Sequence, residues 1–512
     1  MSEVLFTQSY LLRFDPKLHE AMQPYPPLGC LQAAAVVREM GMDVAVFDAM
    51  LAQDESEFKE RLLREKPRYA LIYEDNFNYL SKMCLTRMRD AAMQMISDAV
   101  EQGATVIVCG SDATDHAKRY LEAGASYVIR GEGEATLREL LELLEGRSEA
   151  ALADIAGLIW RQDGEVTQSP PRPVMRALDE LPWPAWDLID ISRYRDIWRE
   201  RHGRFSMSLV TTRGCPFHCN WCAKPIWGQR YNTHSPERVV EMMRHLKETY
   251  GAEHIWFMDD IMGLKKGWMR RFGELIGDDG VPFKCLSRAD LLVRDGEIPA
   301  FAAAGCEIVW IGAESGSQKI LDAMDKGTQL EQIEHAAEHL HAHGVQVAFF
   351  LQFGYPGEGR DEIEKTREMV RRCKPDDIGI SVSYPLPGTP FYAKVKAQLG
   401  AKQNWVDSAD LEMMYHGPFA TEFYRHLHTV IHKEYRSAKI WRQLRGGDLP
   451  TGRKGLRKVA RMMWDRATLR RAERRLDQLA TLPHQGVAPL QGSLSPEQAA
   501  QPSPQDAPEA QP

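Results

Sequence analysis

The sequence predicts an α/β protein with two parallel-sheet domains and a helical C-terminal region. Residues 1–150 alternate short apolar runs with helical stretches, and six further strand–helix units follow between 205 and 390. The chain has 512 residues, whereas an ordinary domain has roughly 150. We expect a doubly wound domain (1–150), a linker (151–204), a partial (β/α)6 barrel (205–390), a helical region (391–480) and a tail without stable structure (481–512).

The N-terminal domain is predicted from short, continuous apolar runs, which are typical of buried parallel strands. A helix over 31–40 stops at Gly41, and a second helix with an apolar face over 85–99 stops at Gly103. Doubly wound sheets bind ligands at the carboxyl ends of their strands, so we expect a ligand there. The expected strands are 4–6, 43–47, 69–73, 105–108 and 127–129.

The second alternation predicts the barrel. Its first helix begins with Ser235 as N-cap and Pro236 at the first helical position, and it ends at Gly251. Six consecutive strand–helix units favour a parallel barrel, in which chemistry takes place at the carboxyl ends of the strands. The expected strands are 208–212, 254–258, 283–286, 307–311, 346–351 and 377–382.

Composition narrows the functional class and the compartment. A net charge of −8 argues against nucleic-acid binding by the chain as a whole. The nine cysteines are odd in number and only three are clustered, which favours a reducing cytoplasm over a disulfide framework. The N-terminal stretch lacks the pattern of a signal peptide, and no run of 18 apolar residues predicts a membrane span. We therefore expect a cytoplasmic protein.

Three of the cysteines, Cys215, Cys219 and Cys222, lie within eight positions at a C-x3-C-x2-C spacing. A structural zinc site takes four ligands, and His218 is a candidate for the fourth. Iron–sulfur clusters also usually take four thiolates, so three would leave one iron open to a substrate or cofactor. An open 4Fe–4S cluster is the preferred interpretation; zinc and buried thiols without metal are the alternatives.

The stretch 214–222, with Trp221 before the third cysteine, resembles the signature of radical S-adenosylmethionine (radical SAM) enzymes. The resemblance implies a partial (β/α)6 barrel and a 4Fe–4S cluster whose open iron chelates S-adenosylmethionine. It also implies that an electron from the cluster cleaves the sulfonium, and that a low-potential donor of flavodoxin or ferredoxin type is a partner. The resulting 5′-deoxyadenosyl radical then abstracts hydrogen from the substrate.

Further segments at strand ends agree with this family. The resemblance makes Asp259 and Asp260 candidates for holding the methionine amine; capping of the next helix is the alternative. It places Glu314 at a ribose-binding position within a turn that also contains Gly312 and Ser315, and the alternative is a helix-entry turn. It also implies close approach of the adenine to the backbone at Gly354.

The N-terminal domain resembles the cobalamin-binding domain fused to one branch of radical SAM enzymes. The usual Asp-x-His-x-x-Gly motif is missing, because Asp15 and His19 have the wrong spacing, so we expect cobalt without a histidine ligand. A doubly wound domain with another ligand, or none, is the alternative. The residues implied in cobalamin binding are Pro27, Leu28, Gly29, Gly110, Ser111, Gly131, Glu132, Gly133 and Thr136.

The resemblance favours a cobalamin-dependent radical SAM methyltransferase acting on an unactivated carbon. Ring formation or oxygenation, as in the anaerobic magnesium-protoporphyrin monomethyl ester cyclase, is the rival reaction, and a cobalamin sensor is the rival of another class. Methylthiotransferase activity is disfavoured, because the N-terminal domain of those enzymes carries additional cluster cysteines. Here Cys30, Cys84 and Cys109 are scattered and are not spaced like a cluster set. A basic amphipathic stretch over 451–475 predicts contact with an acidic surface such as a membrane, and would suit a lipid-like substrate.

Overall fold

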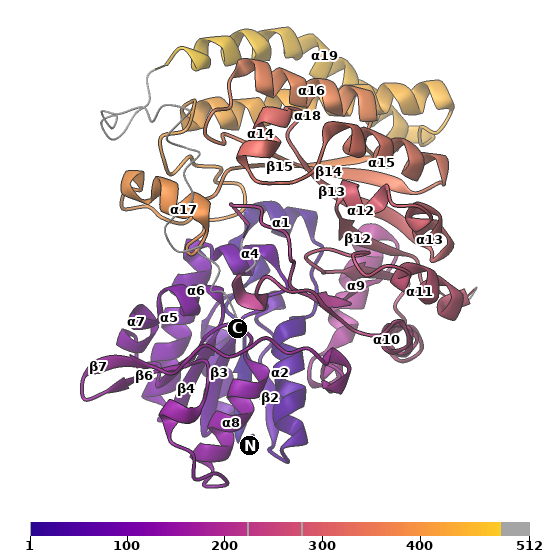
Figure 1. The fold of residues 1–512 in the computed structure, drawn as a ribbon. Coiled ribbons are helices and arrows are strands. Elements are labelled where there is room, and N and C mark those ends of the chain that lie inside the picture. The colour runs from indigo at the N-terminus through magenta and orange to yellow at the C-terminus, as the bar shows by residue number, and fades with distance from the viewer. Residues whose placement is uncertain (1, 223–224, 278–279, 483–512) are drawn as a thin grey trace, which may run out of the picture.

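Two parallel sheets organise the chain, one within residues 4–168 and the other within 206–382 (Figure 1). The structure is a computed structural model that describes residues 2–222, 225–277 and 280–482. The tail expected at 481–512 lies, from residue 483 onward, outside the described residues.

The N-terminal sheet has the strand order β2-β1-β3-β4-β5-β6-β7. Its first five strands are parallel in a doubly wound order, as predicted, and β6 and β7 are added antiparallel at one edge. The sheet thus continues past residue 150, into the segment expected to be a linker. The strands are β1 (Val4–Thr7), β2 (Val44–Val46), β3 (Tyr69–Tyr73), β4 (Thr105–Cys109), β5 (Tyr127–Ile129), β6 (Leu158–Gln162) and β7 (Glu165–Gln168).

Helices cover both faces of this sheet. The predicted apolar face of α5 is buried, because Met88, Ala92, Met95 and Ala99 recur at helical spacing and pack under the strands. The helices are α1 (Pro16–Ala21), α2 (Leu28–Glu39), α3 (Ser56–Glu65), α4 (Tyr79–Met83), α5 (Thr86–Glu101), α6 (Ser111–Asp115), α7 (Ala117–Glu122) and α8 (Glu134–Leu144). The connection to the second domain contains α9 (Ile191–His202).

The second sheet has six parallel strands in the order β15-β14-β13-β12-β11-β8. Neighbours in the sequence are neighbours in the sheet, and β8 does not pair with β15, so the barrel is partial, as predicted. The strands are β8 (Ser206–Leu209), β11 (His254–Phe257), β12 (Phe283–Ser287), β13 (Cys306–Glu314), β14 (Gln346–Phe353) and β15 (Asp377–Val382). The expected strand at 208–212 therefore begins and ends earlier, and a two-residue strand β9 (Thr212–Arg213) follows it.

The helix α10 (Pro236–Tyr250) begins and ends as the sequence predicts. The hydroxyl of Ser235 accepts from the backbone N–H of Arg238 at 3.1 Å, and Gly251 takes the left-handed conformation after the last turn. The other helices of the barrel are α11 (Trp268–Ile276), α12 (Ala289–Leu292), α13 (Glu297–Ala303), α14 (Gln318–Ala323), α15 (Leu330–Ala342), α16 (Arg360–Cys373) and α17 (Pro390–Val395).

Two long C-terminal helices, α18 (Thr421–Gly446) and α19 (Gly452–Ala480), pack against each other and, in Figure 1, lie at the end of the molecule away from the N-terminal sheet. The buried face of α19 includes Met462, Asp465, Ala472 and Leu476. None of the helices within the described residues has the length and apolar character needed to cross a membrane.

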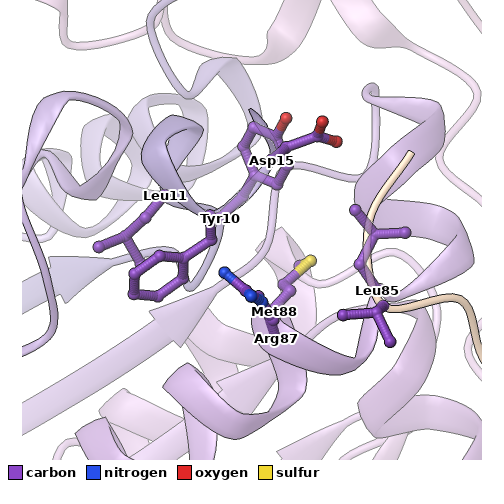
Figure 2. A pocket seen from close by; sticks show the side chains of 8 residues that line it. Tyr10, Leu11, Asp15, Leu85, Arg87 and Met88 are labelled. Carbon is purple, nitrogen blue, oxygen red and sulfur yellow. The ribbon is translucent and has the colours of Figure 1, made fainter. Parts of the chain in front are cut away.

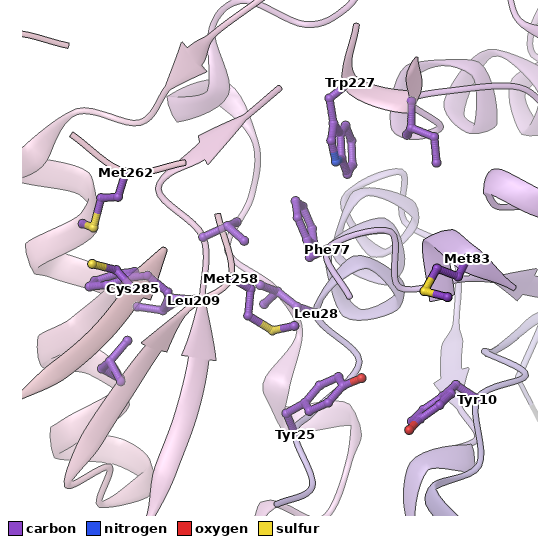
Figure 3. Close-up of a cluster of buried hydrophobic side chains, with 14 of the residues drawn as sticks. Tyr10, Tyr25, Leu28, Phe77, Met83, Leu209, Trp227, Met258, Met262 and Cys285 are labelled. Atoms are coloured by element: carbon purple, nitrogen blue, oxygen red, sulfur yellow. The ribbon is translucent and has the colours of Figure 1, made fainter. Parts of the chain in front are cut away.

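The two domains share one continuous cluster of buried side chains. Figure 3 shows this junction, where Phe77 of the N-terminal domain lies beside Trp227 of the barrel. Their rings are stacked, with centroids 4.9 Å apart and planes inclined by 16°. The carboxyl ends of several strands from both sheets therefore meet across a packed interface.

Candidate active site

The three clustered cysteines lie on a loop that leaves β9 and returns through β10 (Asn232–Thr233), which pairs antiparallel with β9. The loop begins at Gly214, where φ is +84° and a Cβ atom would stand 2.2 Å from the carbonyl oxygen of Arg230. Only glycine fits this closure. Cys219 is buried, Cys215 and Cys222 are half-buried, and none of the three is in a disulfide.

Asn220 holds the middle of the cysteine loop. Its side chain donates to the carbonyl of Ala323 and accepts from the hydroxyl of Tyr355, while its backbone N–H donates to Met324. The loop is thus tied to the end of α14 and to the segment after β14. These bonds would keep the cysteines in one pose whether or not a metal group is bound.

The donor chemistry of the loop fits an iron–sulfur cluster with an open iron. Three reduced thiols lie within eight positions on one loop. Burial, with the neighbouring Asp260, raises the pKa of the Cys222 thiol to about 12, so metal binding there would release a proton. His218, the candidate fourth zinc ligand, is exposed. Within residues 2–222, 225–277 and 280–482, no three Cys, His, Asp or Glu side chains stand close enough to enclose a single ion.

Asp259 holds the entrance to the cysteine loop. One carboxylate oxygen accepts from the backbone N–H groups of Thr211 and Thr212 at 2.6 and 2.9 Å, and the other accepts from the Thr211 hydroxyl at 2.6 Å. Burial raises the pKa of Asp259 to about 7, against these hydrogen bonds. Both oxygens already have partners on the loop, so the contacts seen are structural.

Asp260 instead joins the two domains. It forms an ion pair with Lys82 at the end of α4, and the lysine is almost fully buried. The Ser111 hydroxyl donates to the carbonyl of Lys82 at 2.9 Å, which ties this lysine to the end of β4. Asp260 therefore lies where the N-terminal domain meets the cysteine loop.

Glu314 lies at the end of β13 with a left-handed backbone, φ +56°, which is a strained conformation for this residue. Its carboxylate accepts from the ammonium of Lys326 at 2.8 Å, and both side chains are buried. Burial lowers the pKa of Lys326, yet the facing carboxylate outweighs it and leaves that pKa above its ordinary value. A Cβ at Gly312 would stand 2.6 Å from both groups, and the ring of Trp221 lies near the ammonium.

Ser315 and Gly354 have contacts of other kinds. The Ser315 hydroxyl lies 3.3 Å from that of Thr366 on α16. Gly354 has φ +84°, and a Cβ there would stand 2.2 Å from the side chain of Met413 and 3.2 Å from that of Tyr424. The C-terminal region thus occupies the space beside Gly354. The expected close approach of an adenine to the backbone at Gly354 stays a prediction.

A cavity of about 340 Å³ opens between the N-terminal domain and the barrel. Ser111, Gly131 and Glu132 are the members of the expected cobalamin set that line it, and Ile226 and Gly228 from the return of the cysteine loop form another part of its wall. No histidine is among the described lining residues. The others are Lys82, Thr114, Asp115, Arg130, Pro171, Arg172, Val174, Leu386 and Pro387.

The remaining N-terminal candidates pack against protein. Gly29 donates to Asp75 at 3.2 Å, and the hydroxyl of Thr136 donates to the carbonyl of Ala156. Pro27 and Leu28 form the buried start of α2. A Cβ at Gly110 would stand 2.7 Å from the side chain of Glu74, and one at Gly133 would stand 2.6 Å from those of Cys109 and Tyr73. Their predicted cofactor roles remain predictions.

The segment around Asp15 is a structural joint. Its carboxylate accepts from the N–H of Leu18 at the start of α1 and from the hydroxyl of Ser408. The pocket beside it, shown in Figure 2 with Tyr10 and Met88, has about 10 Å³, room for one water.

Sequence reasoning missed Arg213. Its guanidinium donates to Glu132 at 2.5 Å and to Glu134 at 2.7 Å, so two carboxylates of the N-terminal domain hold the residue that precedes Gly214. The signal was an arginine next to the cysteine motif together with two acids, Glu132 and Glu134, at the end of a predicted strand.

The match to known families agrees with this geometry. Residues 209–370, which contain the cysteine loop and most of the second sheet, match the sequence profile of the Radical SAM superfamily. This part of the chain is a radical SAM domain. The predicted family is confirmed, and with it the prediction of an enzyme.

The similarity to known proteins extends beyond the radical SAM domain. The chain is 29% identical over 395 residues to an uncharacterized methyltransferase of Pyrococcus horikoshii, covering 74% of this chain and 81% of the relative. It is 25% identical over 374 residues to the anaerobic magnesium-protoporphyrin IX monomethyl ester cyclase of Synechocystis sp., covering 72% of each.

The solved structure of the cobalamin-dependent S-adenosylmethionine radical enzyme OxsB, with aqua-cobalamin bound, has the same fold. The TM-score is 0.69 at 16% identity, over 93% of this chain and 72% of that chain. At this identity the likeness shows the fold, in which a doubly wound domain precedes the radical SAM domain.

Proposed function

We propose that this chain is a cobalamin-dependent radical SAM methyltransferase that acts on an unactivated carbon. The observation that carries the proposal is the position of the cavity: one wall comes from the strand ends of the doubly wound sheet, and another from Ile226 and Gly228, just after the cysteines. Groups bound at these two places would face each other across the interface between the domains.

Bound there, the cluster with S-adenosylmethionine would supply a carbon-centred radical and cobalamin would supply the methyl group. The residues of this chain bind and orient. The cysteines would hold the cluster, Glu314 and Trp221 would lie beside the nucleoside, and Ser111, Gly131 and Glu132 would line the space for the corrin. We keep the expectation of cobalt without a histidine from this chain, because the usual Asp-x-His-x-x-Gly motif is missing.

Ring formation is the rival reaction, favoured by the similarity to the protoporphyrin ester cyclase. Anaerobic turnover of cell extract with S-adenosylmethionine carrying a deuterated methyl group separates the two. A product heavier than its substrate by one labelled methyl group supports methylation. An unlabelled product that has lost hydrogen relative to its substrate supports cyclisation. A protein with Cys222→Ala is the control, and cleavage of S-adenosylmethionine by that variant would contradict the proposal.

Two partners belong to this proposal. Reductive cleavage consumes an electron, so we expect a low-potential donor of flavodoxin or ferredoxin type. The second partner is an anionic membrane surface, for which α19 provides the contact. Leu456, Met463 and Trp464 are 72%, 58% and 64% exposed on the face of α19 that points away from α18.

Cations surround these exposed side chains. Arg453, Lys454, Arg457, Lys458 and Arg461 lie on the first half of α19. In the described part of the chain, Arg461 alone among them stands within ion-pair distance of a carboxylate, that of Asp465. Exposed apolar groups among unpaired cations are typical of helices that lie in a lipid interface, and a lipid-like substrate would suit such a location.

A further inference from the structure

A buried polar link between the domains is the pair of hydrogen bonds from Arg213 to Glu132 and Glu134. Nη1 donates to Glu132 at 2.5 Å and Nη2 donates to Glu134 at 2.7 Å, and all three side chains are at most 7% exposed. Two charge-assisted bonds from one planar guanidinium fix direction as well as distance.

Aromatic rings from both domains complete the surroundings of this arginine. Its guanidinium carbon lies 4.9 Å from the ring centroid of Trp227 and 5.5 Å from that of Phe77. Phe77 follows β3, and Trp227 lies on the return of the cysteine loop. The guanidinium therefore contacts a side chain of the N-terminal domain and one from the cysteine loop itself.

The same loops form the cavity wall. Glu132 and Gly131 line the cavity, and Ile226, beside Trp227, lines it from the opposite domain. At another point of the interface, the ion pair of Lys82 with Asp260 joins a further lining residue to the vicinity of Cys222. The cysteine loop is thus held at its start by Glu132 of the cavity wall, and a second ion pair between the domains lies near its third cysteine.

We propose that Arg213 is a positioning residue that sets the separation and orientation of the cysteine loop relative to the cavity of the N-terminal domain. The identity of the two bound groups rests on the proposed function, but the positioning does not. Stability alone does not explain the arrangement, because a buried ion pair can often be replaced by apolar side chains at little net cost. A fixed geometry does explain it, since a reaction that involves groups bound at two places depends on their separation and orientation.

The test measures distance in the intact protein. A nitroxide is attached through an unnatural amino acid at Lys118, which is exposed on α7, and pulsed electron paramagnetic resonance gives its distance distribution to the reduced cluster. We expect one narrow distribution in the parent protein and a broader or displaced one in Arg213→Met and Glu134→Gln. Arg199→Met, which removes a half-exposed ion pair with Glu253, should retain the parent distribution.

Variants of Arg213 that keep their iron content and their parent distance distribution would overturn the proposal. Arg213→Lys keeps the positive charge but loses the planar guanidinium that donates to both acids. It covers the case in which Arg213→Met does not fold, and it should broaden the distance distribution by an intermediate amount. The readout needs no cobalamin. A parent protein that binds no cobalamin, yet loses its narrow distribution in Arg213→Lys, would contradict the proposed function while supporting the positioning role.

Discussion

The guanidinium of Arg288 lies 3.6 Å from the sulfur of Cys219. Arg288 directly follows β12, and it also donates to the carbonyl of Lys326 at 2.7 Å and to the hydroxyl of Thr328 at 3.1 Å. Its carbon lies 3.6 Å from the ring centroid of Phe217. A fixed cation therefore stands beside one of the three thiols, held there by bonds to a neighbouring part of the barrel rim.

We expect Arg288→Met to weaken the cluster. Loss of the positive charge disfavours the additional electron, so the reduction potential should fall by on the order of tens of millivolts, and iron should be lost faster. Redox titration monitored by electron paramagnetic resonance measures the first effect, and iron content after gel filtration the second. Arg294→Met, which removes only a surface hydrogen bond, is the control. Equal potentials in the two variants would contradict the prediction.

Lys326→Met should destabilise the radical SAM domain. The substitution leaves the Glu314 carboxylate buried without its partner, which typically costs about 3–5 kcal/mol. Lys319→Met is a matched control, because that lysine is 62% exposed in its pair with Glu362 and should cost less than about 1 kcal/mol. Denaturant unfolding compares the two. Similar losses for both lysines would show that the Glu314–Lys326 pair is not a buried site of high cost.

Gly133→Ala should disturb the end of the N-terminal sheet. The added methyl would stand 2.6 Å from the sulfur of Cys109 and from the hydroxyl of Tyr73, and such overpacking costs about 1–3 kcal/mol. Gly400→Ala adds a methyl with nothing within 4 Å and should be nearly neutral. Thermal unfolding and cobalamin retention are the measurements. If Gly133→Ala behaves like Gly400→Ala, the contact at the sheet end does not restrict this loop.

Glu358→Gln should change how stability depends on pH. Burial raises the pKa of Glu358 from 4.5 to about 8, although the backbone N–H of Gly354 donates to it. The stability from the protonated carboxyl is complete below pH 4.5 and is lost as pH rises through 8. The unfolding free energy of the variant should therefore rise relative to that of the parent protein between pH 5 and pH 9, by up to about 4 kcal/mol.

The quantity to follow is the difference in unfolding free energy between variant and parent at each pH, which removes contributions from other groups. Glu338→Gln, on the exposed face of α15, should give a difference that does not change with pH. A flat difference for Glu358→Gln would mean that this carboxyl titrates normally in the folded protein.

The exposed face of α19 should bind anionic vesicles. We expect sedimentation with phosphatidylserine vesicles that weakens with salt, is absent with phosphatidylcholine alone, and is lost when Leu456, Met463 and Trp464 are changed to Ser. Leu63→Ser with Val166→Ser removes exposed apolar groups elsewhere and should leave sedimentation unchanged. Unchanged sedimentation of the α19 variant would contradict the proposal that α19 contacts an anionic membrane.

Elements with a strong local pattern could be predicted from the sequence. The strand 69–73 agrees with β3, and the helix predicted between Ser235 and Gly251 agrees with α10. The strands β6 and β7 were missed for two reasons. β7 is polar and largely exposed, so it lacks the apolar run by which buried strands are recognised, and the buried apolar run of β6 is only three residues long, Leu158 to Trp160.

The candidate site divides in the same way. The cysteine spacing, the order of strand-end motifs and the family follow from residues that are near one another in the chain. The partners of buried charges do not: Arg213 bonds to acids 79 and 81 positions away, and Thr211 bonds to Asp259 at a separation of 48. Glu132 lines the expected cavity and yet also binds an arginine of the other domain.

The amino-acid pattern was sufficient for the parallel strands of the two sheets and for the cysteine motif, because burial period, capping and turn geometry depend on residues a few positions apart. Only the folded chain decided which acids pair with Arg213, which side chains surround Gly354, and where the cavity opens. These depend on how two sheets dock, and a buried charge takes whichever partner the docking brings within hydrogen-bond distance.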